Sequence, residues 1–224
     1  MDLVKNIKLI EYSKTVDALN SLTHGIGAVL SLGAMISLVI KAVSFTDTIG
    51  LISCIIYGIS MLSVYVISAV YHGLPPGRPK LVARLFDHLA IPLAFAGTCT
   101  PCALITLRNV SAPHAVIIFV LAWFLAIFGV TSKLFFFEKM RKAVMWVYFS
   151  IGFIMLFICI PLLKGGTINN HGFYVLITGS FFYCVAGLFC YLGIKRPYFH
   201  ILFHIFIIVA SGFQFFAIYQ YILH

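Results

Sequence analysis

Charged residues are scarce in this chain of 224 residues. Asp, Glu, Lys and Arg together make up 9% of the sequence, whereas an ordinary soluble domain contains about 25%. Hydrophobic residues make up 62%, which is more apolar surface than one water-soluble core of this length can enclose. The shortage of charge therefore excludes an ordinary soluble domain, and the surplus of apolar side chains is expected to face lipid.

Long apolar runs supply the expected membrane spans, since a helix needs about 20 apolar residues to cross the hydrocarbon layer. Residues 1–20 mix lysines with acidic residues and show no cleavage site, so they predict a short cytoplasmic segment rather than a secretory signal peptide. The rest, 21–224, predicts an all-α bundle of seven transmembrane helices. Turn signals and charged residues separate these helices, which we expect at residues 21–41, 48–71, 85–107, 113–132, 143–163, 171–192 and 198–222.

The distribution of positive charge predicts the orientation of the bundle. The net charge is +9, and 12 of the 15 Lys and Arg residues fall in connections that would share one side of the membrane. The positive-inside rule then places the N-terminus in the cytoplasm and the C-terminus outside. Topology and anionic lipid headgroups explain the basic excess, so we expect membrane lipids as partners and no nucleic acid.

Cysteine usage points to packing rather than to a disulfide framework. The six cysteines all fall inside predicted helices, where a thiol behaves as a small apolar side chain. Cys99 and Cys102 have the spacing of a redox or metal motif, but no other Cys or His lies near them in sequence. We therefore expect a structural role for this pair.

Four ionisable side chains are predicted to lie at one depth in the membrane. The topology places His72 at the end of the second helix, Asp87 near the start of the third, and His200 and His204 in the first two turns of the seventh. All four then lie near the cytoplasmic boundary, with offsets on the order of 5–12 Å. Charged groups are costly at this depth, so their convergence asks for a functional explanation.

The spacing of these residues suits a metal ion. His200 and His204 stand four residues apart on one helical face, as two ligands of one ion would. His72 would add a third nitrogen and leave a fourth position open for water. Ser68 precedes His72 by one turn, and Asp87 could orient a histidine or accept a proton from water. The simpler alternative is that each histidine is an interfacial polar residue, and the spacing alone leaves both readings open.

At these positions the sequence resembles the hemolysin III family, the bacterial branch of the progestin and adipoQ receptors. The resemblance rests on four stretches in the family order: Asn20-Ser-Leu-Thr-His24-Gly-Ile-Gly27, Ser68-Ala-Val-Tyr-His72, Asp87-His-Leu-Ala-Ile-Pro-Leu-Ala-Phe-Ala-Gly97-Thr-Cys-Thr-Pro101 and His200-Ile-Leu-Phe-His204. It implies seven helices, a cytoplasmic N-terminus and a location in the bacterial plasma membrane.

The same resemblance implies a zinc site. It assigns the three zinc ligands to His72, His200 and His204, contact with the zinc-bound water to Asp87, and the family serine to Ser68. The wider superfamily includes alkaline ceramidases, so the implied chemistry is hydrolysis of a lipid amide.

Two positions depart from the family pattern. Cys99 stands where the family usually has Tyr, and Asp17 stands where it commonly has Glu. We expect neither side chain to touch the proposed ligands. His24 could lie beside the ligands or be a polar group at a helix end. His88 is rotated by about 100° from Asp87 on the helix, so we exclude it from the site.

Three functions compete at this point. The first is a zinc-dependent hydrolase of a ceramide-like lipid, or a related role in membrane lipid homeostasis. The second is a non-enzymatic lipid sensor with a structural zinc ion. The third is a cytolytic pore, which we rank last because permanent spans without a cleavable signal are typical of a resident membrane protein.

Overall fold

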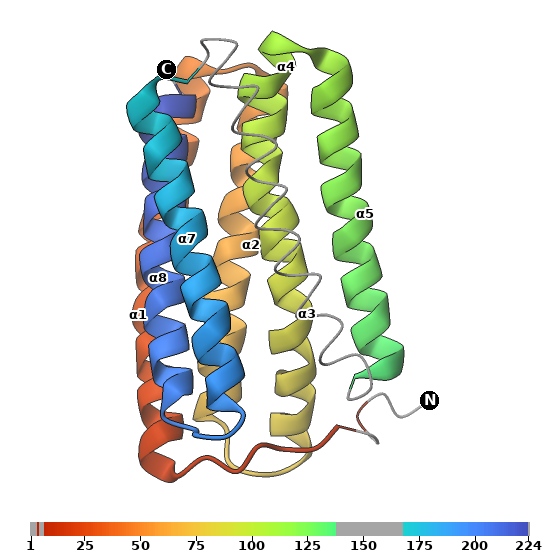
Figure 1. Cartoon of the computed structure of the whole chain (residues 1–224), viewed down its shortest axis with the longest axis vertical. Coiled ribbons are helices and arrows are strands. Elements are labelled where there is room, and N and C mark those ends of the chain that lie inside the picture. The colour runs from red at the N-terminus through yellow and green to blue at the C-terminus, as the bar shows by residue number, and fades with distance from the viewer. Residues whose placement is uncertain (1–3, 5–6, 138–167, 224) are drawn as a thin grey trace.

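The computed structural model describes residue 4, residues 7–137 and residues 168–223, and these form a bundle of long helices (Figure 1). Within these ranges the structure contains no strand. Two stretches have the wider π-helical turn, Cys102–Leu107 after α3 and Ile218–Ile222 after α8. The α-helices in chain order are α1 (Lys14–Phe45), α2 (Thr48–Gly73), α3 (Arg78–Pro101), α4 (Arg108–Val110), α5 (Ala112–Phe136), α7 (Asn170–Gly193) and α8 (Phe199–Ala217).

Six of the described helical stretches are long and apolar enough to cross a membrane. This confirms the predicted all-helical membrane architecture. The predicted helix over 143–163 lies outside the described residues, so the total of seven spans and the orientation of the termini stay predictions. The six described spans are Lys14–Phe45, Thr48–Gly73, Arg78–Val110, Ala112–Phe136, Asn170–Gly193 and Phe199–Ile222.

Two helices begin earlier than the hydropathy pattern predicts. α1 begins at Lys14 rather than at residue 21, because the Ser13 hydroxyl accepts a hydrogen bond from the Val16 amide at 3.3 Å and caps the helix. α3 begins at Arg78 rather than at residue 85, and a proline in its first turn suits a helix start. Polar first turns of this kind carry no hydropathy signal, so only the structure reveals them.

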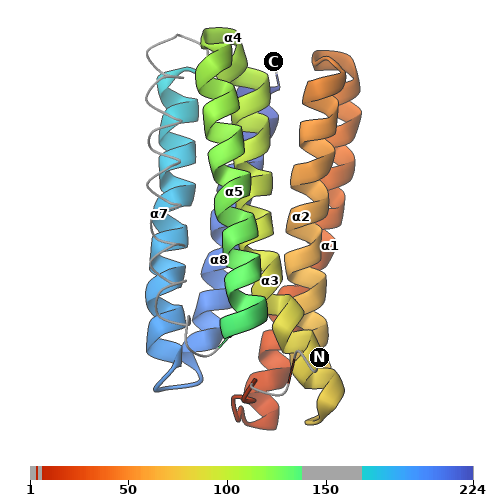
Figure 2. The same cartoon turned by 90° about the vertical axis from the view of Figure 1, so that its right-hand side faces the viewer.

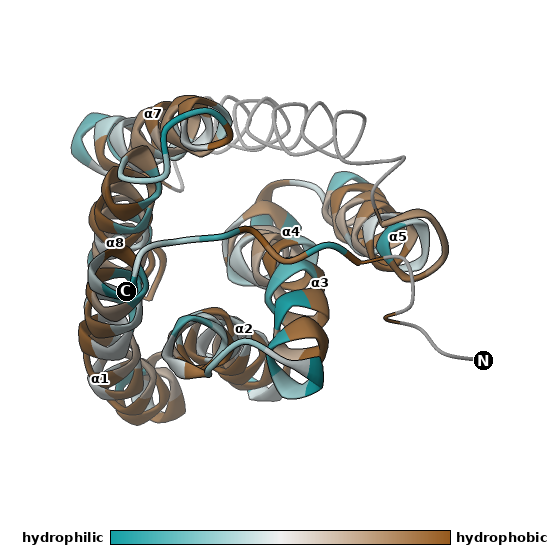
Figure 3. Cartoon of the chain, turned by 90° about the horizontal axis from the view of Figure 1, so that it is seen from below, coloured by the Kyte–Doolittle hydropathy of each residue, from teal (hydrophilic) through white to brown (hydrophobic). Residues whose placement is uncertain are grey.

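The helices pack in a connected series. α1 lies against α2 and α8, α2 against α3, α3 against α5, and α7 against α8 (Figures 1 and 2). Among the six described spans, Arg78–Val110, which begins with α3, is the most enclosed, with 78% of its most apolar window buried. Large apolar side chains such as Val29 and Phe124 are 73% and 63% exposed. Hydrophobic residues make up most of the described helices (Figure 3), and many of them are exposed, as lipid contact requires.

One end of the bundle, which we call the histidine end, holds the start of α1, the α2–α3 turn and the α7–α8 turn (Figures 1 and 2). In the α2–α3 turn, Gly77 has a φ of 151°, a backbone conformation that residues with a side chain rarely adopt. α5 runs towards this end, whereas α7 begins at the opposite end (Figure 1). At that opposite end Asp47 caps α2, and the Gly50 amide that it accepts from holds the pKa of Asp47 below its ordinary value.

Candidate metal centre

Three histidines meet at the histidine end of the bundle. His72 lies in the last turn of α2, and His200 and His204 lie in the first two turns of α8. One ring nitrogen from each falls in a group whose members all lie within 4.8 Å of one another. The ring centroids of His200 and His204 are 4.6 Å apart, and that of His72 lies 5.4 and 5.1 Å from them. The structure thus brings together the three side chains that the sequence predicted as ligands.

The hydrogen bonding of His72 leaves one nitrogen available. Its Nδ1 lies 2.9 Å from Oδ1 of Asp17 in the first turn of α1. A carboxylate only accepts, so Nδ1 carries a hydrogen and donates it in a hydrogen bond, and in the neutral ring the lone pair is then on Nε2. His72 is 2% exposed, and its Nε2 has no hydrogen-bond partner among the described residues.

His204 has the same protonation pattern. Its Nδ1 lies 3.3 Å from the Asn20 carbonyl oxygen and 3.4 Å from the Thr23 hydroxyl. The Thr23 hydroxyl donates its own hydrogen to the Asn20 carbonyl at 2.9 Å, so both neighbours of Nδ1 act as acceptors. Nδ1 of His204 therefore carries the proton, and Nε2 retains its lone pair.

This donor set fits a zinc ion. Neutral imidazole nitrogens suit zinc and other transition metals, whereas magnesium and calcium prefer oxygen ligands. A buried nitrogen lone pair without a partner, as on His72, is costly unless something binds it. The three histidines could therefore hold a metal ion, with Nε2 of His72 and His204 as the expected ligand atoms.

Asp87 lies on α3 beside the histidines but outside their group. The Ser68 hydroxyl hydrogen-bonds its carboxylate, and the carboxylate interacts electrostatically with His72 and His200. The Asp87 side chain is 14% exposed. A partly buried carboxylate near the imidazoles of His72 and His200 can accept a proton during a reaction.

His88, the next residue on α3, has different contacts from those of Asp87. Its Nδ1 lies 3.0 Å from the Arg84 carbonyl oxygen and 3.4 Å from Oδ2 of Asp87, and its ring packs on Phe137 at 4.9 Å. It does not belong to the histidine group, which agrees with its exclusion on helical geometry.

The expectation that Asp17 would not touch the proposed ligands is wrong. Its carboxylate contacts His72 directly because α1 begins at Lys14, which places Asp17 in a helical turn beside the end of α2. The sequence signal that could have indicated this contact is that Asp17 stands where the family commonly has another acidic residue.

Sequence analysis also missed Tyr12. Its ring lies 5.4 Å from the ring of His72 and 5.5 Å from that of His200. Burial raises the pKa of the Tyr12 phenol well above its ordinary value. Tyr12 therefore stays neutral over two of the three histidines, and no local sequence pattern signalled this position.

His24 lies beside His204, a predicted ligand, rather than at a helix end. Its ring stacks on that of His204 with centroids 3.6 Å apart and an angle of 16° between the planes. Both of its nitrogens, and both polar atoms of the Asn20 amide, have no partner among the described residues. Of the two alternatives for His24, the structure supports the one next to the histidine group.

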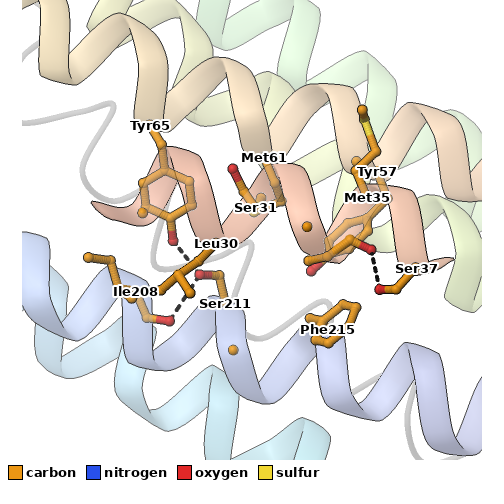
Figure 4. A pocket seen from close by; sticks show the side chains of 15 residues that line it. Leu30, Ser31, Met35, Ser37, Tyr57, Met61, Tyr65, Ile208, Ser211 and Phe215 are labelled. Atoms are coloured by element: carbon orange, nitrogen blue, oxygen red, sulfur yellow. Dashed lines mark hydrogen bonds between the residues drawn. The ribbon is translucent and has the colours of Figure 1, made fainter. Parts of the chain in front are cut away.

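A cavity of about 430 Å³ lies between α1, α2 and α8 (Figure 4). Tyr65 forms part of its wall, donates or accepts a hydrogen bond with the Ser211 hydroxyl, and meets the ring of His24 edge-on at 5.2 Å. Because His24 stacks on His204, only two rings separate this largely apolar cavity from a predicted ligand. The labelled lining residues are Leu30, Ser31, Met35, Ser37, Tyr57, Met61, Tyr65, Ile208, Ser211 and Phe215.

The model of the haemolysin-III-related family matches residues 12–215 of this chain. The chain belongs to the haemolysin-III-related family. The match includes every histidine of the candidate centre together with Asp17, Ser68 and Asp87. This haemolysin-III-related chain is a multi-pass membrane protein.

Individual relatives agree with the family match. Hemolysin-3 of Bacillus cereus is 34% identical over 204 residues, which cover 91% of this chain and 90% of that protein. A hemolysin-3 homolog of Bacillus subtilis (strain 168) is 32% identical over 202 residues, covering 90% and 92%. The human monocyte to macrophage differentiation factor is 25% identical over 173 residues, covering 75% and 69%. The family match, the bacterial relatives and the six described apolar spans together indicate a multi-pass protein of the bacterial plasma membrane.

Proposed function

We propose that this protein is a zinc-dependent hydrolase that cleaves a lipid amide, ceramide-like in chemistry, at the membrane boundary. The observation that carries the proposal is the group of His72, His200 and His204 with Asp87 beside it. Two of these histidines turn Nδ1 towards acceptors, which keeps a lone pair on Nε2 for a metal ion, and the carboxylate supplies a proton acceptor.

Each residue has a distinct role in the proposed reaction. A zinc ion held by the three histidines would act as a Lewis acid on the amide. Asp87 takes a proton from the attacking water and passes it to the leaving nitrogen. Ser68 holds the Asp87 carboxylate through its hydroxyl, which limits the orientations that this base can adopt.

A lipid substrate suits the surroundings of the centre. The outer faces of the described helices are apolar, and the cavity between α1, α2 and α8 could take part of an acyl chain. Both features support a substrate that reaches the centre from within the membrane rather than a water-soluble amide.

Replacement of Asp87 by Asn tests the proposed reaction. The variant should keep its zinc, because the histidines are unchanged, and lose hydrolysis by about 10²- to 10⁴-fold, because the proton acceptor is removed. The measurement is release of fatty acid from a panel of ceramides and N-acyl lipids by detergent-purified protein. His114→Ala, an exposed histidine near the start of α5, is a matched control that should retain full activity.

Inactive wild-type protein with zinc bound would contradict the hydrolase and favour the second candidate, a lipid sensor with structural zinc. The specific observation behind that candidate is Tyr12, whose ring packs over His72 and His200. A metal that ties α2 to α8 would stabilise the bundle without any reaction. In that case Asp87→Asn should leave the cellular effect of the protein unchanged. A cytolytic pore stays the least favoured of the three predictions.

A further inference from the structure

Asp17 uses both of its oxygens in the described structure. Oδ1 lies 2.9 Å from Nδ1 of His72, and Oδ2 lies 2.7 Å from Nζ of Lys80. The side chain of Lys80 is only 3% exposed, and that of Asp17 is 19% exposed. The three side chains come from three helices, α1, α2 and α3, so this is a tertiary contact rather than a local one.

Lys80 is itself held in place. Its ammonium also donates to the Leu74 carbonyl oxygen at 3.0 Å, directly after the last turn of α2, and lies 5.5 Å from the ring centre of Tyr71. A buried ammonium needs such partners because its desolvation is costly. Lys80 therefore fixes the Asp17 carboxylate relative to the end of the helix that carries His72.

The two buried histidines of the proposed metal site, His72 and His204, have hydrogen-bond acceptors of unequal strength. Nδ1 of His72 donates to a charged carboxylate at 2.9 Å, whereas Nδ1 of His204 faces a neutral carbonyl oxygen at 3.3 Å. Hydrogen bonds to charged acceptors are shorter and stronger than those between neutral groups. A single side chain, that of Asp17, therefore controls the orientation of His72 more strongly than any single side chain controls that of His204.

We propose that Asp17 is the positioning residue for His72, and that Lys80 acts through Asp17. The proposal rests on the metal part of the proposed function. By accepting a hydrogen bond from the Nδ1–H group, Asp17 keeps the lone pair of His72 on Nε2, fixes the ring and makes Nε2 a stronger donor to the metal. By binding the second oxygen, Lys80 prevents the carboxylate from turning towards the metal and becoming a ligand itself.

The test is zinc affinity, measured by competition with a chromophoric chelator on purified full-length protein. Asp17→Ala should weaken zinc binding by about 10- to 100-fold. Asp17→Asn should recover part of this loss, because its amide oxygen can still accept a hydrogen bond from the Nδ1–H group. Lys80→Met should weaken binding less than Asp17→Ala. In the Asp17→Ala background Lys80→Met should add nothing, since Lys80 acts only through that carboxylate.

A matched control separates positioning from general damage. Asp47→Asn changes a carboxylate that also forms an ion pair, with Arg108 at 2.8 Å, at the opposite end of the bundle, and it should leave zinc affinity unchanged. Cobalt-substituted protein gives a second readout: the visible absorption of the metal should shift in Asp17→Ala and stay the same in Asp47→Asn. A role in folding alone would not change that spectrum.

The outcomes distinguish this inference from the proposed function. Wild-type protein without bound zinc would overturn the metal centre itself. Wild type that binds zinc, together with an Asp17→Ala variant of equal affinity and equal cobalt spectrum, would overturn only the role of Asp17. If Asp17→Ala does not fold, equal affinities of Asp17→Asn, Lys80→Met and wild type would overturn it in the same way.

Discussion

His72 and His204 share one hydrogen-bonding pattern, which would suit the binding of a metal ion. Each places Nδ1 against an acceptor from the first turns of α1, Asp17 in one case and the Asn20 carbonyl in the other. Each is nearly inaccessible to solvent, at 2% and 1% exposure. One helix therefore sets the protonation pattern of proposed ligands that two other helices contribute.

The zinc content of single-residue variants should test the proposed ligands one at a time. Wild-type protein should contain about one zinc ion per chain, while His72→Ala and His204→Ala should contain almost none, because two ligands without a third hold zinc weakly. Elemental analysis of purified protein provides the measurement. His114→Ala should keep the wild-type content, and full zinc in His72→Ala would exclude that residue as a ligand.

At the scale of elements, the contact between α2 and α3 controls how far apart Ser68, His72 and Asp87 lie. Gly97 of α3 faces Ser60 of α2 so closely that a β-carbon at this position would lie 2.8 Å from Cβ of Ser60. Small residues allow such close approach of helices in membranes. The close approach of α2 and α3 therefore depends on Gly97, which lies in one of the four stretches that resemble the family.

Gly97→Ala should separate the two helices and destabilise the protein. Overpacking of this kind costs about 1–3 kcal/mol, which corresponds to a fall of several degrees in the melting temperature measured in detergent. Gly33→Ala is the matched control, since a β-carbon there meets nothing within 4 Å, and its melting temperature should change little. Ser60→Gly in the Gly97→Ala background should restore part of the loss; no restoration would argue against a steric cause.

At the scale of the whole molecule, positive charge gathers at the histidine end. Of the Lys and Arg residues in the described ranges, only Lys41 and Arg108 lie towards the opposite end (Figure 1). We propose on this basis that the histidine end faces the cytoplasm. The described residues at that end are Lys8, Lys14, Arg78, Lys80, Arg84, Lys133, Lys195 and Arg196.

Reporter fusions should reveal this orientation. Fusions in the α2–α3 turn, at residues 74–77, and in the α7–α8 turn, at residues 194–198, should both report the cytoplasm. A fusion at the α1–α2 turn and one at the C-terminus should report the outside. An inside N-terminus with an outside C-terminus requires an odd number of spans, as the predicted seven would give. If the two turns at the histidine end report opposite sides, the metal centre cannot form.

The sequence by itself predicted the six described helical spans and the candidate ligands. Spans follow from the length of apolar runs, and the pairing of His200 with His204 follows from the repeat of a single helix, so neither depends on packing. His72 joined them because topology alone places its end of α2 at the same side of the membrane as the start of α8.

Only the tertiary structure decided how the centre is supported. The contact of Asp17 with His72, the stacking of His24 on His204 and the position of Tyr12 depend on where α1 begins and on which of its faces turns towards α2 and α8. Hydropathy carries no information on these points, because a polar first turn looks the same as a loop and a nearly all-apolar span has no distinct inner face. Packing between helices, rather than any local pattern, therefore placed Asp17 and Lys80 beside the predicted ligands.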